Sequence, residues 1–282
     1  MTNAARCIGV LLFGRGKVAL ICAALAACTS ETRPLRLGTT YTVEQSGALA
    51  VLDSLHPPAA VTVVVGPSGQ ILRSAAAGDL DVVITHAPSL ERRLLVAAGH
   101  AAWRCPFVAS RFAIVGPAAD RAGVARTATA VDALRRIARA GAPFVSRGDS
   151  SGTQVKELAL WERAGVSPRG GGRPWYVESG TDQAATLRLA DERRAYALAD
   201  LPTFTRLSGL ELRVLFADDA ALVNPYTLYV IRSPSSHPAA AAFGSWALAD
   251  WRARLLASRL EDGVAAFTPV AGGCAVPAPD EP

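Results

Sequence analysis

Short hydrophobic blocks, separated by polar turns, recur along most of the chain. Val61–Val65 is a β-branched block typical of a strand, and Gly66-Pro67-Ser68-Gly69 leads from it into a helical pattern over Gln70–Ala77. Gly78 follows in the position at which glycine ends many helices, and Asp81–Thr85 is a further strand pattern. Strands that alternate with helices at this spacing predict an α/β protein with a parallel, doubly wound sheet.

A second α/β unit is predicted after residue 117, where the same alternation continues. Its elements are a helix over Val131–Ala140, a strand over Phe144–Ser146, helices over Thr153–Ala164 and Ala184–Asp191, and a strand over Tyr196–Ala199. Extended segments near Phe112–Pro117 and Leu222–Pro225 connect the two units. We therefore expect two lobes, one made of residues 29–117 and 222–282 and the other of residues 118–221.

Composition excludes two classes of protein. Half of the 282 residues are hydrophobic and only 19% are charged, which is the opposite of the balance found in disordered chains. The chain has a pI of about 9.2, but three of its basic residues lie within residues 1–27, and basic and acidic residues nearly balance in the remainder. Because no basic cluster is interleaved with aromatic residues, we expect no nucleic-acid binding.

Residues 1–28 have the pattern of an export signal. A basic start without acidic residues leads into the apolar run Val18–Ala27, which is too short to span a bilayer as a permanent helix. The run ends in Leu25-Ala26-Ala27-Cys28, which resembles the lipobox of bacterial lipoproteins, where the cysteine receives a lipid. The alternative is an ordinary secretory signal in which Cys28 has no role. We expect an exported protein, in the periplasm or on the outer face of the cytoplasmic membrane, anchored by a lipid on Cys28.

Two further cysteines remain in the exported chain. Cys105 and Cys274 can form a disulfide, since an exported protein resides in an oxidising compartment. The alternative is two unrelated buried thiols.

Three polar turns follow predicted strands and lead into helices. They are Thr39-Thr40-Tyr41-Thr42, Gly66-Pro67-Ser68-Gly69 and Ser146-Arg147-Gly148-Asp149-Ser150-Ser151-Gly152-Thr153. Ligands of open parallel sheets bind beyond the carboxyl ends of the strands, and helix N-termini there favour anions. The hydroxyls add hydrogen-bond donors without charge, and Arg147 can bind two oxygens of one anion. Any single turn is equally explained by ordinary helix capping, and Ser151-Gly152-Thr153-Gln154 matches a capping box. Three such turns in equivalent positions favour an anion site.

Two of these turns carry a family resemblance. Gly38–Gly47 resembles the threonine-rich opening of tungstate-binding proteins of the TupA type, and Pro143–Thr153 is similar to the most distinctive segment of that family. Further matches follow in the same order at Gly78–Val82, Ile114–Pro117, Trp175–Glu178, Thr186-Leu187 and Asn224–Tyr226. The resemblance extends from about Leu35 to His237.

The resemblance implies a two-lobed periplasmic-binding-protein fold of type II, each lobe a doubly wound, mostly parallel sheet with flanking helices. It implies a monomeric binding protein without a cofactor or enzymatic activity, whose partners are a small inorganic anion and an ABC permease with its ATPase. The anion is tungstate, with molybdate next. Carried over residue by residue, the anion ligands are Thr39, Thr40, Ser68, Arg147, Ser151 and Thr153.

The chain departs from the family pattern at several positions. Tyr41 stands where threonine is usual, Ala87 where aspartate is common, and Leu201 where an arginine is common. Other oxyanions therefore stay open. Sulfate is smaller and needs a tighter site, and phosphate carries a proton that a carboxylate such as Asp149 can accept.

Other classes of function have less support. Gly148–Gly152 is one residue from the sequence around some serine-protease nucleophiles, but no histidine lies in a catalytic context. The histidines are scattered and no pair has metal-ligand spacing, so we expect no metal cation site. His86, beside a predicted strand end, is the one histidine of interest. A lipoprotein that senses an anion without transporting it remains the alternative to transport.

Overall fold

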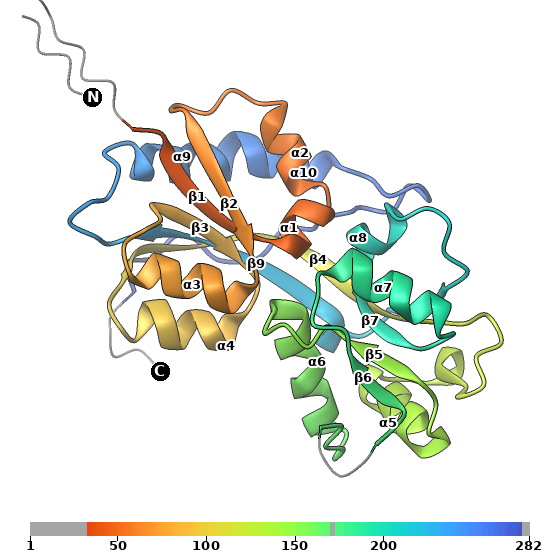
Figure 1. Cartoon of the computed structure of the whole chain (residues 1–282). Helices are drawn as coiled ribbons and strands as arrows, with labels where there is room; N and C mark the ends of the chain where they lie inside the picture. Colours follow the sequence, from red (N-terminus) through yellow and green to blue (C-terminus); the bar gives the residue numbers. More distant parts are fainter. Residues whose placement is uncertain (1–32, 170–172, 278–282) are drawn as a thin grey trace, which may run out of the picture. The chain divides into compact units, whose positions relative to one another are not determined.

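Three parallel strands begin the sheet of the computed structural model, which is described over residues 33–169 and 173–277 (Figure 1). β1 (Leu35–Thr40) lies between β2 (Val61–Gly66) and β3 (Val82–Thr85), and Thr40 is the partner of Gly66. β1 and β2 therefore end at the same edge of the sheet. There the chain enters α1 (Tyr41–Gln45) and α3 (Ser68–Ala76), and α2 (Ala48–Asp53) follows α1.

Two long antiparallel strands continue the sheet. β9 (Val223–Ile231) pairs with β3 and with the first part of β4 (Ala101–Gly116). Beyond Arg111, β4 pairs with β7 (Ala197–Asp200) and β8 (Arg213–Phe216). The strand order is β2-β1-β3-β9-β4-β7, with β8 on β4. The sheet is thus mixed, because the strands that link its two ends pair antiparallel.

A smaller parallel sheet belongs to the second part of the chain. It consists of β5 (Phe144–Ser146) and β6 (Tyr176–Glu178), and a parallel bridge between Phe144 and Tyr196 places β5 beside the start of β7. The helices of this part are α5 (Ala130–Ala140), α6 (Gly152–Arg163), α7 (Gln183–Glu192) and α8 (Leu201–Thr205).

The remaining helical elements are shorter or lie near the C-terminus. They are α4 (Pro88–Glu91), a π-helical turn (Arg92–Val96), 3-10 turns at Val124–Arg126 and Ala220–Leu222, α9 (Ala240–Trp246), a π-helical turn (Ala247–Trp251) and α10 (Arg252–Ala257). Within the described ranges, no helix combines the length and apolar character that crossing a membrane requires.

Successive side chains of each strand point to opposite faces of the sheet, and hydrophobic residues form a core on both faces. Leu228 of β9 packs into a cluster with Phe243 and Trp251, under α9 and α10, whereas the next residue, Tyr229, packs with Ile71 of α3 on the opposite face. Figure 1 shows α9 and α10 on one side of β1 and β3 and α3 with α4 on the other. Burial on both faces explains why β3 is hydrophobic over Val82-Val83-Ile84.

Four hydrophobic clusters divide the described residues. Two of them use only residues up to 108 and from 226 onward, and the other two use residues 112–222. The α/β fold predicted from the sequence is confirmed. The division into lobes 29–117 with 222–282 and 118–221 stays a prediction, with which the distribution of the clusters agrees. The described residues from Arg33 onward form one compact unit. Residues 1–28, with the expected lipid on Cys28, lie outside the described residues.

The C-terminal segment is joined to β4. Cys105 and Cys274 form a disulfide between positions 169 residues apart, and Ala275 and Thr268 make isolated antiparallel bridges to Arg104 and Ala109. The pairing that the sequence left open against two free thiols is therefore present in the structure.

Candidate functional site

The first polar turn lies where β1 meets α1. Thr40 is the N-cap of α1, and its Oγ1 accepts a hydrogen bond from the N–H of Val43 at 3.3 Å. This cap uses a lone pair of Thr40 and leaves its hydroxyl proton for a ligand. Thr39, by contrast, donates its hydroxyl proton to the carbonyl of Ile84 on β3 at 3.0 Å. Thr39 is thus buried beside the turn, but its hydroxyl binds the neighbouring strand.

The second and third turns meet directly. Ser68, the first residue of α3, accepts a hydrogen bond at its Oγ from the N–H of Gly152, the first residue of α6, at 3.0 Å. Ser151 is the N-cap of α6, and its Oγ accepts from the N–H of Gln154 at 3.2 Å. Ser68 and Ser151 are both buried. The capping role considered from the sequence is therefore real, and it coexists with a meeting of two helix N-termini.

Thr42 joins the first turn to the third. Its Oγ1 lies 3.5 Å from Oγ1 of Thr153 and accepts a hydrogen bond from Arg147 at 3.1 Å. Thr42 is fully buried and was not among the six ligands carried over from the family resemblance. Its position in the first turn of a helix capped by Thr40 is the signal that could have identified it.

Arg147 is the central charge of this cluster, with a side chain that is only 1% exposed. Besides Thr42, it donates from Nε to the carbonyl of Thr181 at 3.3 Å, and it forms a short ion pair with Asp149. Burial lowers the pKa of the Arg147 guanidinium and the carboxylate of Asp149 opposes that effect. An arginine has so high an ordinary pKa that the side chain keeps its charge.

We call the six buried residues Thr40, Thr42, Ser68, Arg147, Ser151 and Thr153 the polar cluster. Five of them belong to the predicted ligand set, and Thr42 replaces Thr39. The cluster gathers one full positive charge, several hydroxyls and the N-termini of α3 and α6, whose first-turn N–H groups have no acceptor within their own helices. Such an arrangement can hold a compact anion by one charge and many dipoles.

His86 borders the polar cluster and is also buried. Its Nδ1 lies 3.0 Å from Oδ1 of Asn224. The ring also approaches α6, since a Cβ added at Gly152 would lie 2.6 Å from both Cε1 and Nδ1 of His86. Burial lowers the pKa of His86 to about 3, and the positive charge of Arg147 adds to this effect. The imidazole is therefore neutral, and only a residue without a side chain fits at position 152.

A buried carboxylate lies behind His86, where β4, β7 and β9 meet. Asp200 accepts hydrogen bonds from the hydroxyl of Ser110, from Nδ2 of Asn224 at 3.1 Å and from the N–H and hydroxyl of Thr203 at 3.3 and 3.0 Å. It is also the N-cap of α8. These contacts give Asp200 a structural role at the strand crossing.

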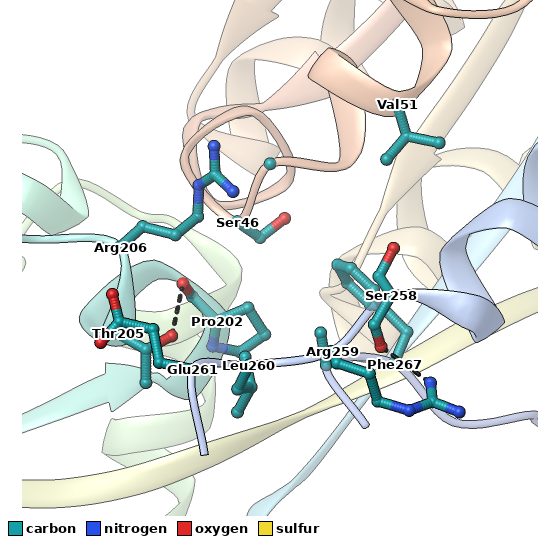
Figure 2. Close-up of a pocket in the computed structure, with 12 residues that line it drawn as sticks. Ser46, Val51, Pro202, Thr205, Arg206, Ser258, Arg259, Leu260, Glu261 and Phe267 are labelled. Atoms are coloured by element: carbon teal, nitrogen blue, oxygen red, sulfur yellow. Dashed lines mark hydrogen bonds between the residues drawn. The ribbon is translucent and has the colours of Figure 1, made fainter. Parts of the chain in front are cut away.

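One cavity lies apart from the polar cluster. Figure 2 shows it between the start of α2, α8 and the segment after α10, with Ser46, Arg206 and Phe267 among its lining residues and a volume of about 210 Å³. None of its lining residues belongs to the polar cluster, in which Thr42 contacts both Arg147 and Thr153 and Ser68 binds the N–H of Gly152. No group of three or more potential metal ligands exists among residues 33–169 and 173–277.

Comparison with known proteins places this fold in a family. A family model described as "PBP superfamily domain" matches residues 27–250. A tungstate-binding protein TupA from Peptoclostridium acidaminophilum is 31% identical over 89% of this chain and 95% of its own. A putative ABC transporter anion-binding protein from Haloferax volcanii is 37% identical over 74% of this chain, which spans 62% of that relative's length. A crystal structure of the tungstate ABC transporter from Geobacter sulfurreducens matches with a TM-score of 0.69 and 36% identity over 79% of this chain and 97% of its own.

The α/β fold, with its mixed sheet and flanking helices, is that of a periplasmic binding protein. Within this class, the chain belongs to the family of TupA-type tungstate-binding proteins.

Proposed function

We propose that this protein binds a tetrahedral oxyanion, most specifically tungstate, at the polar cluster and delivers it to an ABC importer. The single observation that supports the proposal best is the buried Arg147 among hydroxyls of α1, α3 and α6. A buried guanidinium is costly unless it is paired, and among the described residues Asp149 forms an ion pair with it while the charge of Asp182 adds a further favourable effect. Asp149 already offsets the charge of Arg147, so a bound dianion would be stabilised by the guanidinium together with the hydroxyls and the N–H dipoles at the helix N-termini.

The ligand set that we propose is Thr40, Thr42, Ser68, Arg147, Ser151 and Thr153. Thr39 would contribute through its backbone and not its side chain, because its hydroxyl donates to the carbonyl of Ile84. Hydroxyls and N–H groups are donors, which suits an anion without a proton, such as tungstate or molybdate. A proton on phosphate needs an acceptor, and Asp149 is already bound to Arg147 and to the N–H of Ser151. This favours the fully deprotonated anions, and among them the names of the relatives favour tungstate over molybdate.

The same family membership supports a role in transport. Relatives are named as components of ABC transporters, which supports a permease with its ATPase as the partner. Export, lipid attachment at Cys28, a monomeric state and the absence of enzymatic activity are parts of the same proposal. The disulfide between Cys105 and Cys274 supports export, because such bonds persist in oxidising compartments. An anion-sensing role without transport is the alternative, and the absence of binding to the permease would favour it.

Isothermal titration calorimetry of the purified protein tests the ligand. Tungstate, molybdate, sulfate and phosphate are titrated separately in a buffer that contains no oxyanion. We expect one-to-one binding of tungstate and molybdate, with sulfate and phosphate silent. Binding of phosphate or sulfate in preference to both metal oxyanions would refute the assignment of the ligand, and silence of all four would refute the site.

A further inference from the structure

His86 has one ring nitrogen whose role the fold does not explain. The side chain is 3% exposed, and its Nδ1 pairs with Asn224, but Nε2 is buried without a hydrogen-bond partner among the described residues. A buried polar atom without a partner is costly and requires an explanation, such as a ligand that the site accepts.

The strand crossing decides which nitrogen of His86 carries the proton. Nδ2 of Asn224 donates to Ser110 at 3.0 Å and to Asp200 at 3.1 Å. If the amide were reversed, its oxygen would face the carboxylate of Asp200, which is unfavourable. Oδ1 of Asn224 therefore faces His86 and requires a proton on Nδ1. Nε2 of the neutral ring is then a bare lone pair.

One edge of the His86 ring lies at the polar cluster. A Cβ added at Gly152 would approach both Cε1 and Nδ1 of His86 to 2.6 Å, and Nε2 is bonded to Cε1. The imidazole thus packs against the first residue of α6, whose N–H binds Ser68, and Nε2 lies one bond from this contact. Phe112 and Tyr226 enclose the ring, with centroid distances of 6.4 and 5.5 Å. The orientation of the ring is therefore fixed.

The charges around His86 determine what Nε2 can do. Arg147 and Lys156, from the third turn and α6, both disfavour a positive imidazole. Asp200 lies behind Asn224, and Glu91, which accepts from Thr85 and from the N–H of Ala87, lies on the chain segment that follows His86. The balance changes when a dianion enters. One opposite charge in contact moves a pKa by about 1–3, and a dianion acts about twice as strongly.

We propose that His86 is a further ligand of the anion site and that it takes up one proton at Nε2 when the oxyanion binds. The proton comes from solvent, one N–H bond forms, and the resulting imidazolium donates to the anion while Nδ1–H keeps its bond to Asn224. No side chain has to rotate, because Oδ1 of Asn224 accepts from Nδ1–H in both states. The inference rests on the proposed function, since it concerns the same site.

Proton-linked binding has a defined sign. The pKa of His86 rises on binding, so a lower pH favours the bound state between the pKa values of the free and bound protein. Because burial and nearby positive charge hold the pKa of His86 in the free protein at about 3, anion affinity should increase by up to about tenfold for each unit by which the pH falls from the higher pKa of the bound state toward about pH 3. A protein that captures anion in this way binds it more tightly in an acidic environment.

Calorimetry with sodium tungstate near neutral pH measures this proton directly. The unaltered protein is titrated in several sulfonate and amine buffers that differ in ionisation enthalpy, and the dependence of the observed heat on that enthalpy gives the protons taken up. We expect between one half and one proton per anion for the unaltered protein, and close to none for His86→Gln. His56→Gln is the matched control, because His56 is exposed and does not belong to the polar cluster, and it should take up as many protons as the unaltered protein.

The outcomes separate the two proposals. Tungstate binding without proton uptake refutes the role of His86 and leaves the proposed function intact. Equal uptake by the unaltered protein and His86→Gln also refutes it, because another group then titrates. If tungstate does not bind, molybdate, sulfate and phosphate are titrated in turn. Silence of all four refutes the anion site, and this inference with it. The measurement on the unaltered protein does not depend on whether the variant folds.

Discussion

Arg147→Ala removes the one full positive charge of the polar cluster. In the unaltered protein the guanidinium is 1% exposed, donates to Thr42 and to the carbonyl of Thr181, and pairs with Asp149, which is 7% exposed. In the complex the guanidinium forms a buried charge pair with the anion, and removing one partner of such a pair costs about 3–5 kcal/mol of binding free energy. At about 1.4 kcal/mol for each tenfold change, the dissociation constant for tungstate should rise about 100-fold to 4,000-fold.

The assay must separate lost affinity from lost stability. Arg147→Ala also leaves Asp149 buried with only the N–H of Ser151 as a partner, so the free energy of unfolding falls as well. A second variant, Arg147→Ala with Asp149→Asn, removes both charges and should recover stability but not binding. Calorimetry gives the dissociation constants, and urea unfolding without anion gives the free energies.

Two further variants make the interpretation specific. Arg147→Lys keeps the charge but lacks the planar fork, and we expect a loss of about tenfold in affinity. Arg139→Ala, on the exposed face of α5, removes an arginine from the same part of the chain and should bind as the unaltered protein does. If Arg147→Ala binds tungstate within about threefold of the unaltered affinity, the anion does not bind at this cluster and our reasoning is wrong.

Three further predictions concern the packing at Gly152, the disulfide and the stability of the protein at low pH. Gly152→Ala places a Cβ 2.6 Å from the ring of His86 and should weaken anion binding by about 10- to 100-fold in calorimetry. Gly69→Ala is the control and should bind as the unaltered protein does, because its added Cβ would have no atom closer than 3.5 Å. Equal affinities of the two variants would contradict the close packing at Gly152. Cys274→Ser opens a disulfide between positions 169 residues apart and should lower the free energy of unfolding by about 2–4 kcal/mol in non-reducing urea titrations, a difference that must vanish when both proteins are reduced. Burial alone would raise the pKa of Asp81, but hydrogen bonds from two arginines hold it well below the ordinary value, so its stabilising effect is complete above about pH 4 and is lost as the pH falls further. Thermal unfolding between about pH 5 and about pH 2 should therefore decline less steeply for Asp81→Asn than for the unaltered protein, and parallel declines would exclude this role.

Several elements of the fold follow from local patterns alone. The strand Phe144–Ser146 was predicted with its observed bounds, and Val61–Val65 and Val131–Ala140 differ from β2 and α5 by one residue. Such segments are predictable because hydrophobic periodicity and turn residues act over a few neighbours. The first half of β4 was missed, since Arg104 and Pro106 interrupt its hydrophobic pattern, yet pairing with β9 holds it in the sheet.

The candidate site, like the fold, was predictable only in part from the sequence. Residue types in the three turns, with one arginine among hydroxyls, predicted an anion site, and the family resemblance implied five of the six residues of the polar cluster. No local pattern could show that the hydroxyl of Thr39 donates a hydrogen bond to the carbonyl of Ile84, because that bond joins residues 45 positions apart. Nor could the sequence pair Ser68 with Gly152, or His86 with Asn224 across 138 positions.

The sequence by itself determined the α/β class, the chemistry of the turns and the family. Strand and helix patterns are properties of neighbouring residues, and hydroxyls and a guanidinium favour anions wherever they lie. Only the tertiary structure decided which of those groups share one buried site and which are already used within the fold. The reason is that hydrogen bonds between distant segments depend on how strands β1, β3, β4 and β9 align, and that alignment results from packing over the whole sheet.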